Sequence, residues 1–435
     1  MTRVYTAFVG CKVSQADADG LGAALQQDGH VRVEAADAQV SVVVTCCVTA
    51  EAERKSRQLV NRLAAGGRRV VVTGCAAAYR PEQFAAPGAV VAARPKVAAA
   101  VRELSGVAEA GATGEAADAA RTTRRATAPD ARPPVSAARS LAAPGRGSRT
   151  RLTLKAQDGC SCACAYCAVR LARGPLWSQS LEQAVAAARA GLAAGCGEIV
   201  LSGINLGLYR DPDGADLAAL VGTLVELPGL LRLRLSSLEP AHLQDRLLRS
   251  LAHPKVARHL HVPLQSADDG VLAAMDRPYD FAGYRRRLAA ARDALGDVMI
   301  STDVIVGFPT ETDEAFARTL AAIGPAAGLF GRVHVFPYSR RPGTAAAELP
   351  AVPVAEVRRR RAAALDAGAA ARRAAAAAEV GTEAEVLVED RVAGLWRGYT
   401  SKYTRCYLGG DAHPGTLVRV AVQEVFEDGV RGVVA

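Results

Sequence analysis

Short apolar runs alternate with helical patterns over the N-terminal part of the chain. The runs VYTAFV, VSVVV and RRVVVTG have the length and composition of buried strands. Between them, residues 14–28 and 49–65 place apolar side chains at helical spacing. Strands that alternate with helices are typical of βαβ units. We therefore predict an α/β domain with a parallel sheet over residues 1–104.

The same alternation returns over residues 150–372. Six runs in this region read as strands separated by helical sequence: RLTLKA, EIVLSG, RLRLSS, HLHVPL, MISTDVIVG and GRVHVFPY. Repeated βα units indicate a parallel barrel, here a partial (β/α)6 barrel. Polar residues follow the carboxyl ends of these strands, which is where such barrels build active sites.

The C-terminal residues 376–435 alternate apolar and polar positions between glycine turns, which predicts a small antiparallel β-barrel. An Arg/Ala-rich helix, Val354 to Val380, precedes it, and we expect Arg358 to Arg361 to lie on its solvated face. The predicted fold class is thus α/β, with an N-terminal parallel βαβ domain, a central partial barrel and a C-terminal β-barrel.

Residues 105–149 interrupt the pattern. This segment consists largely of Ala, Gly, Thr, Pro and Arg and has no aromatic residue, so we predict a disordered linker. Its arginines could instead contact a phosphate backbone.

The chain carries a net charge of +9, which favours a polyanionic partner such as nucleic acid. A genome that encodes Arg and Ala at high frequency would give the same excess. The start MTRVYTAFVG lacks the features of a signal peptide, and no run of about 20 apolar residues appears. We expect a cytoplasmic protein with no membrane partner, whose ten cysteines stay reduced.

Four cysteines crowd the stretch KAQDGCSCACAYCAVRLARG, directly after the first barrel strand. Cys160, Cys164 and Cys167 form a C-x3-C-x2-C pattern that suits three thiolate ligands of a [4Fe–4S] cluster. The fourth iron would stay open and could bind S-adenosylmethionine. Zinc is the alternative, with Cys162 completing a tetrahedral set. The run does not have a usual zinc spacing, and we expect Cys162 to point away from the other three thiols.

Three further cysteines each follow a predicted strand of the N-terminal domain, namely Cys11, Cys46 and Cys75. The carboxyl ends of parallel strands meet at one edge of a sheet, so these thiols should converge on a second cluster with an open iron. The alternative is that they are small buried residues. Cys47 adjoins Cys46 and could substitute for it, but chain neighbours cannot easily face the same cluster, so Cys46 is kept. Cys196 and Cys406 are expected to be ordinary core or surface residues.

The pattern resembles the methylthiotransferases of the radical S-adenosylmethionine superfamily along nearly the whole chain. GCKVSQADADG, VVVTCCVTAEAERKSRQ and VVVTGCA resemble the three cysteine motifs of the first domain, and the loop quoted above resembles the radical motif. Val9, Ser14, Val44 and Ala267 depart from the family pattern, and none of them is a cluster ligand. The terminal barrel resembles the family's RNA-binding TRAM module.

The resemblance implies two [4Fe–4S] clusters and two uses of S-adenosylmethionine, as radical source at Cys160, Cys164 and Cys167 and as methyl donor. It also implies a low-potential electron donor such as ferredoxin or flavodoxin. We expect S-adenosylmethionine to be held at the strand ends by Tyr166, which would lie beside the adenine, and by Gly203, Glu239 and Asp303. These four could instead be turn or barrel-rim residues.

The motifs SGINLG and RLSSLEP resemble the branch that acts on N6-threonylcarbamoyladenosine in the tRNA anticodon stem-loop. The sister branches act on isopentenyladenosine in tRNA or on an aspartate of a ribosomal protein. A non-catalytic iron–sulfur RNA-binding protein is the alternative of another class.

Aromatic and basic residues alternate in the terminal segment LWRGYTSKYTRCY. Aromatic rings stack on unpaired bases and cations contact phosphates, so this segment is a candidate RNA-binding site, with an ordinary barrel surface as the alternative. The candidate residues are Trp396, Arg397, Tyr399, Lys402, Tyr403 and Arg405. His259 and His261 share one face of a predicted strand, where ordinary hydrogen bonds are favoured over a metal site.

Overall fold

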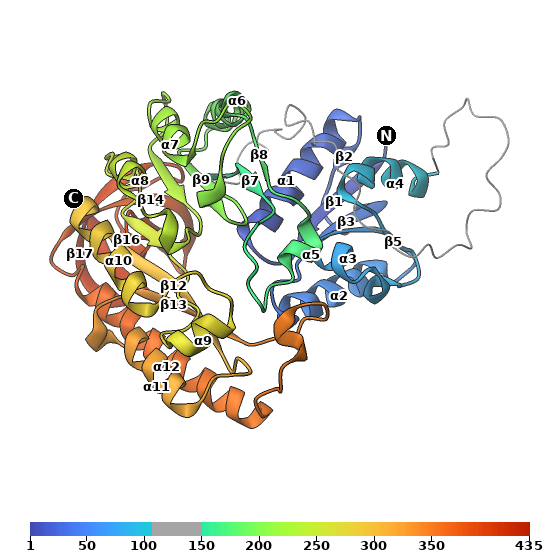
Figure 1. Cartoon of the computed structure of the whole chain (residues 1–435). Helices are drawn as coiled ribbons and strands as arrows, with labels where there is room; N and C mark the ends of the chain where they lie inside the picture. Colours follow the sequence, from blue (N-terminus) through green and yellow to red (C-terminus); the bar gives the residue numbers. More distant parts are fainter. Residues whose placement is uncertain (107–149) are drawn as a thin grey trace. The chain divides into compact units, whose positions relative to one another are not determined.

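The computed structural model describes residues 1–106 and 150–435 (Figure 1). It divides into two compact units. The described part of the first comprises residues 1–106 and Leu171–Gly174, and that of the second comprises residues 150–170 and 175–435. Nearly all of the predicted linker lies outside the described residues.

The first unit is built on a five-stranded sheet in the order β2-β1-β3-β4-β5, and every neighbouring pair is parallel. All six residues of β3 are buried, which is expected for the central strand of a sheet covered on both faces. The predicted N-terminal α/β fold is therefore confirmed. Its elements are β1 (Arg3–Phe8), α1 (Lys12–Gln27), β2 (Val31–Arg32), β3 (Val40–Thr45), α2 (Ala50–Ala64), β4 (Arg69–Gly74), α3 (Cys75–Tyr79), β5 (Ala89–Val91) and α4 (Val97–Leu104).

The six strands predicted for the central region form two three-stranded parallel sheets, in the orders β10-β9-β6 and β11-β12-β13. A bridge between Ser237 and His261 connects the two sheets, so the strands follow one another around an open barrel. This confirms the predicted partial barrel. The strands are β6 (Arg151–Lys155), β9 (Glu198–Ser202), β10 (Arg232–Leu235), β11 (His259–His261), β12 (Met299–Val306) and β13 (Arg332–Pro337), with a small hairpin of β7 (Gln157–Asp158) and β8 (Trp177–Ser178).

Helices connect these strands, and most begin at a residue whose side chain caps the free backbone N–H groups of the first turn. Ser180, Asp216, Asp268, Asp280 and Thr312 each accept such a hydrogen bond. No helix in the described part of the chain is long and apolar enough to cross a membrane. The helices are α5 (Val169–Arg173), α6 (Leu181–Ala193), α7 (Leu217–Val225), α8 (Asp245–Leu251), α9 (Asp269–Ala274), α10 (Phe281–Leu295), α11 (Asp313–Ile323) and α12 (Val354–Ala377), with short 3-10 turns η1 (Pro81–Phe84), η2 (Arg94–Lys96), η4 (Leu206–Leu208), η5 (Pro240–His242), η6 (Pro325–Ala327) and η7 (Ala345–Glu348).

The C-terminal strands close into a barrel in the order β14-β15-β16-β18-β17. All neighbouring pairs of this barrel are antiparallel except β16 and β18, and Val386, Val388, Val420 and Val422 fill the interior. The predicted small β-barrel is therefore confirmed. Its strands are β14 (Glu383–Val392), β15 (Leu395–Thr400), β16 (Arg405–Gly409), β17 (Leu417–Phe426) and β18 (Gly429–Val434).

One expectation for α12 is wrong. Arg360 does not lie on a solvated face, because the whole residue is only 4% exposed. Its guanidinium forms ion pairs with Glu311, Asp313 and Glu356, and these pairs compensate the burial of its charge.

Candidate functional site

The three predicted N-terminal cysteines lie at the carboxyl edge of neighbouring strands of the first sheet. Cys11 is the residue before α1, Cys46 follows β3 directly and Cys75 is the first residue of α3. Because β1, β3 and β4 are adjacent and parallel, three loops from separate parts of the sequence meet at this edge.

Two glycines permit the close approach of these loops. Gly10, before Cys11, has a φ of +118°, and a Cβ atom there would lie 2.6 Å from the sulfur of Cys46. Gly74, before Cys75, has a φ of +94°, and a Cβ atom there would lie 2.5 Å from the carbonyl oxygen of Thr45. Any larger residue would therefore force the cysteine loops apart.

The thiols of this edge interact in two pairs. Hydrogen bonding with Cys46 lowers the pKa of Cys11 to about 5, and it raises the pKa of Cys46. Hydrogen bonding with Cys47 lowers the pKa of Cys75 to about 7 against the opposing effect of burial. Cys47 was set aside because chain neighbours cannot easily face the same cluster. Here both neighbours face this edge, since Cys46 contacts Cys11 and Cys47 contacts Cys75.

Arg173 is a member of this site that we did not predict. It lies in the segment Leu171–Gly174 of the first unit, and its Nε donates to Cys75 Sγ at 2.9 Å. Its guanidinium also pairs with the buried Asp17 at 3.1 Å, and Arg94 pairs with the same carboxylate at 2.8 Å. The side chain of Arg173 is 1% exposed, so this cation lies in a medium where it favours thiolates strongly.

The central cysteines lie together on the loop after β6 and are all partly exposed. Hydrogen bonding with Cys162 lowers the pKa of Cys160 to about 6, and the Cys162 backbone N–H and the Asn205 amide act in the same direction. Burial raises the pKa of Cys167 to about 11. The expectation that Cys162 points away from the other thiols is therefore wrong, since its thiol contacts that of Cys160.

Arg277 links this loop to the strand ends. Its NH1 donates to Cys164 Sγ at 3.2 Å, and its NH2 pairs with Glu239 and donates to the Tyr279 hydroxyl at 2.9 Å. The Arg277 side chain is 2% exposed, so a buried cation contacts both a thiol and a carboxylate here. Nothing in the local sequence distinguishes Arg277, because its partner thiol is 113 residues away along the chain.

The four residues predicted to contact S-adenosylmethionine fall into different surroundings. Tyr166 and Glu239 lie near Arg277 and the cysteine loop, and burial raises the pKa of the Tyr166 hydroxyl. Gly203 packs against Gln157, where a Cβ atom would lie 2.8 Å from the amide oxygen. That oxygen accepts from the Asn205 backbone N–H, so Gly203 allows Asn205 to reach Cys160. Asp303, on β12, instead lies beside His261 of β11.

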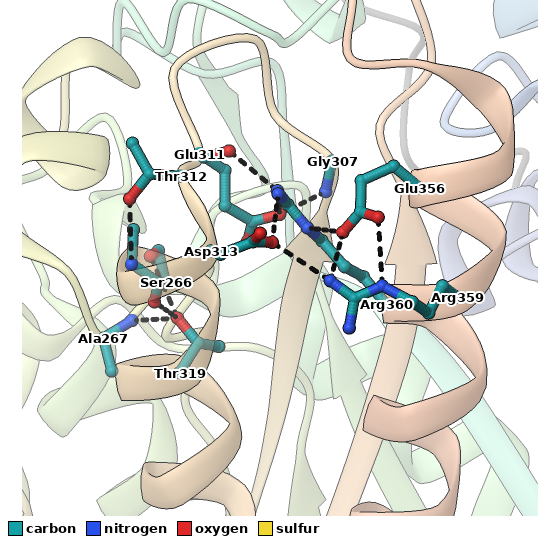
Figure 2. Close-up of polar contacts among 11 residues, drawn as sticks. Ser266, Ala267, Gly307, Glu311, Thr312, Asp313, Thr319, Glu356, Arg359 and Arg360 are labelled. Atoms are coloured by element: carbon teal, nitrogen blue, oxygen red, sulfur yellow. Dashed lines mark hydrogen bonds and ion pairs between the residues drawn. The ribbon is translucent and has the colours of Figure 1, made fainter.

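Two loops at the carboxyl ends of β11 and β12 are fixed by buried polar contacts (Figure 2). Thr319 of α11 accepts from the Ala267 backbone N–H at 3.0 Å and hydrogen-bonds Ser266 at 3.2 Å. Glu311 accepts from the Gly307 backbone N–H at 2.6 Å and pairs with Arg360 of α12 at 2.9 Å. Helices α11 and α12 therefore hold the rim of the barrel in place.

The six residues predicted to bind RNA all have partners within the second unit. Tyr403 packs against His259 with the rings tilted by 48° and their centroids 5.0 Å apart, and it lies under the Arg234 guanidinium at 4.3 Å. The other contacts are Tyr399 with Arg151, Trp396 with Arg391, Arg397 with Asp390, Lys402 with Asp297 and Arg405 with Asp428. The segment thus contributes to the contact between the terminal and central barrels.

The described thiols do not gather as closely as a single zinc ion would require. A zinc ion bound by four thiolates at about 2.3 Å brings the sulfur atoms within about 3.8 Å of one another. In the described residues, the one group of three metal-binding side chains with ligand atoms within 4.8 Å is His261, Asp303 and His334, and no three thiols form such a group. Two sets of thiols, each with one sulfur contacted by a buried arginine, are suitable ligands for iron–sulfur clusters.

Comparisons with known proteins agree with this chemistry. Residues 154–323 match the Radical SAM superfamily, and residues 3–93 match the uncharacterized protein family UPF0004. The threonylcarbamoyladenosine tRNA methylthiotransferase MtaB of Thermotoga maritima is 31% identical over 99% of this chain and 96% of its own length. That of Bacillus subtilis is 31% identical over 97% and 94%. The tRNA-2-methylthio-N(6)-dimethylallyladenosine synthase of Sorangium cellulosum is 35% identical over 94% and 88%.

The fold is also similar to that of a solved radical enzyme. The radical S-adenosylmethionine methyltransferase TsrM from Kitasatospora setae superposes with a TM-score of 0.55, at 16% identity, over 80% of this chain and 75% of that chain. At this identity the similarity concerns the fold alone. The relatives that match over nearly the full length identify the family: the chain belongs to the methylthiotransferases of the radical S-adenosylmethionine superfamily.

Proposed function

We propose that this enzyme adds a methylthio group to C2 of N6-threonylcarbamoyladenosine next to the tRNA anticodon. The observation that carries the proposal is the presence of two separate thiol sets, one at a sheet edge and one on a barrel loop, each with a buried arginine beside a thiol. The motifs SGINLG and RLSSLEP and the names of the Thermotoga and Bacillus relatives support the threonylcarbamoyl substrate.

The reaction needs a radical because the C2–H bond of adenine is not acidic enough for a side-chain base. The chemistry supplied by the bound groups would be reductive cleavage of S-adenosylmethionine at Cys160, Cys164 and Cys167, and sulfur and methyl transfer at Cys11, Cys46 and Cys75. An electron donor of the ferredoxin or flavodoxin type would deliver the electron.

The residues around the central loop have positioning roles in this proposal. Tyr166, Gly203 and Glu239 would contact S-adenosylmethionine, and Arg277 would hold the Glu239 carboxylate in place through their ion pair. Asp303 was predicted to belong to the same group. That assignment remains a prediction, and the neighbours of Asp303 favour the role described in the next subsection.

The terminal barrel would bind the RNA substrate. Trp396 and Arg397 are the strongest candidates, because their partners Arg391 and Asp390 lie on the same barrel and exchange readily for a base and a phosphate. Tyr399, Lys402, Tyr403 and Arg405 would extend this surface. Their present partners include residues of the central barrel, so RNA would have to share or replace those contacts.

Isopentenyladenosine in tRNA is the second candidate substrate, favoured by the name of the Sorangium relative. Mass spectrometry of tRNA nucleosides from cells with and without the gene tests the proposal. We expect the 2-methylthio derivative of threonylcarbamoyladenosine to disappear in the deletion strain. If only the 2-methylthio derivative of isopentenyladenosine disappears, isopentenyladenosine is the substrate instead. Unchanged tRNA would support a ribosomal-protein substrate or a non-catalytic role.

A further inference from the structure

Three polar side chains on neighbouring strands of the central barrel converge at one point. His261 of β11, Asp303 of β12 and His334 of β13, here named the barrel polar patch, place their nitrogen and oxygen atoms within 4.8 Å of one another. His261 Nε2 lies 3.2 Å from Asp303 Oδ2, and the rings of His261 and His334 are 5.8 Å apart between centroids. Asp303 and His334 are direct partners in the register of their strands.

The patch faces the inside of the barrel. Residues two apart on a strand share a face, so Ser301 and Asp303 lie on the same side of β12. Thr302, between them, lies within 3.5 Å of the Tyr284 hydroxyl of α10, which covers the opposite face. The side chains of His261 and Asp303 keep 14% and 24% of their surface exposed, so a molecule that enters the barrel can reach their polar atoms.

A chain of hydrogen bonds fixes the donors and acceptors of the patch. The Ser301 hydroxyl lies 2.8 Å from His259 Nε2 and 2.9 Å from His261 Nδ1, and it can donate to only one of these rings. With a neutral His261 whose Nε2–H donates to Asp303, the Ser301 hydroxyl donates to His261 and accepts from His259. The Asp303 carboxylate then retains acceptor capacity, and His334 provides a second group beside it.

The patch lies at the end of the barrel that carries the candidate site. The Leu238 backbone N–H donates to the His261 carbonyl oxygen at 2.9 Å, and Glu239 is the next residue along the chain. Glu239 in turn pairs with Arg277, which contacts Cys164. The residues Leu238 and Glu239, which follow β10, therefore connect the patch to the cysteine loop.

We infer that the barrel polar patch hydrogen-bonds the substituent on N6 of the target adenine and selects a threonylcarbamoyl group over an isopentenyl group. This inference rests on the proposed function and assigns residues to its substrate choice. A carbamoyl group offers N–H donors to Asp303 and oxygen acceptors to His334. An isopentenyl group is a hydrocarbon that would cover these polar atoms without replacing their hydrogen bonds to water.

Burying one polar group without a partner weakens binding by about 5- to 150-fold. A site built to hydrogen-bond its substrate rejects an analogue that lacks the polar group more strongly than an apolar pocket rejects a polar analogue. The patch should therefore act mainly against the isopentenyl substrate, and an apolar replacement in the patch should relieve this rejection.

Anaerobic fluorescence anisotropy with synthetic anticodon stem-loop RNAs tests the inference. Three RNAs that differ only at N6 of the target base, with a threonylcarbamoyl, an isopentenyl or no substituent, would be titrated with the cluster-loaded protein. The variants are His334→Phe, the more conservative His334→Gln, and His413→Phe as a matched control on an exposed histidine of the terminal barrel. Iron content and thermal unfolding report whether each variant is folded.

We expect the wild-type protein and His413→Phe to bind the threonylcarbamoyl RNA at least about 10-fold more tightly than the isopentenyl RNA. His334→Phe should bring this ratio close to one, and His334→Gln should give an intermediate ratio. A ratio that stays at the wild-type value in both His334 variants overturns the inference and leaves the proposed function intact.

Two further outcomes would also overturn it. A wild-type preference for the isopentenyl RNA contradicts the role of the patch. Stoichiometric zinc or manganese in the purified protein, lost in both His334 variants but not in His413→Phe, would make the patch a metal site instead. By contrast, failure to form any methylthio product on any of the three RNAs would contradict the proposed function itself.

Discussion

The two sets of cysteines are built in opposite ways. In the first unit, the thiols come from three loops separated by dozens of residues. Cys46, Cys47 and Cys75 are at most 3% exposed, whereas Cys11 is exposed. In the central barrel, all four thiols come from one loop and remain partly exposed. In both sets a buried arginine, Arg173 or Arg277, donates to one sulfur.

This difference indicates different roles for the protein around each set. An open loop at the mouth of a barrel can admit S-adenosylmethionine and an electron donor. A set assembled at a sheet edge depends on the fold of the whole domain, and all of its thiols but Cys11 are buried. We therefore expect changes at the two sets to have separable effects, and the predictions below are ordered from the largest effect to the smallest.

Cys164→Ala should abolish cleavage of S-adenosylmethionine. The variant removes one of the three proposed thiolate ligands, the sulfur to which Arg277 donates. Formation of 5′-deoxyadenosine, measured by liquid chromatography with dithionite as reductant, should fall below detection. Cys162→Ala is the matched control on the same loop and should retain cleavage; loss in both variants would mean that four thiols are needed.

Cys75→Ala should separate the two activities. Methylthio transfer to RNA should be lost, because Cys75 is one of the three thiols at the sheet edge, while 5′-deoxyadenosine formation should remain largely intact. Cys196→Ala, at another buried thiol, controls for packing and should leave both activities unchanged. Parallel loss of cleavage and transfer in Cys75→Ala would contradict the division of labour between the two sets.

Arg360→Met should destabilise the second unit by about 3–5 kcal/mol, because it leaves the buried Glu311 carboxylate without its cation. Urea unfolding followed by circular dichroism measures this effect. Arg359→Met is the matched control: Arg359 pairs with the same Glu356 but is 58% exposed, so its loss should cost about 1 kcal/mol or less. Equal effects in the two variants would show that Arg360 does not anchor the barrel rim.

Arg173→Gln should lower methylthio transfer by about 10- to 100-fold, as is typical for the loss of a residue that orients a metal ligand. It should also shift the reduction potential of the iron–sulfur signal that disappears in Cys75→Ala, because a charged donor to the Cys75 sulfur is removed. Arg170→Gln, on the same helix but exposed, should change neither quantity. An unchanged potential in Arg173→Gln would assign Arg173 a purely structural role.

The sequence predicted the folds of both units and the meeting of Cys11, Cys46 and Cys75 at one sheet edge, because strand periodicity and the position of each cysteine after a strand are local signals. Arg173, Arg277 and Arg360 escaped prediction for a physical reason. Each pairs with a group 49 to 113 residues away, and in a chain with 53 basic residues no local pattern distinguishes them.

The treatment of Cys47 and the error at Cys162 have a related cause. Both thiols were judged from their spacing along the chain, which set Cys47 aside and suggested that Cys162 would point away from the other thiols. The loops turn so that Cys47 reaches Cys75 and Cys162 reaches Cys160. The conformation of an irregular loop depends on contacts such as the Asn205 amide, which lies 43 residues from Cys162. Such contacts are not encoded in cysteine spacing.

The iron content of the anaerobically reconstituted protein, compared with that of two triple variants, tests the central claim most directly. Two four-iron clusters require about eight irons per chain in the wild-type protein. Replacing Cys11, Cys46 and Cys75 by alanine, or separately Cys160, Cys164 and Cys167, should each leave about four. A wild-type content of about four irons, or the loss of all iron in either triple variant, would contradict two independent clusters.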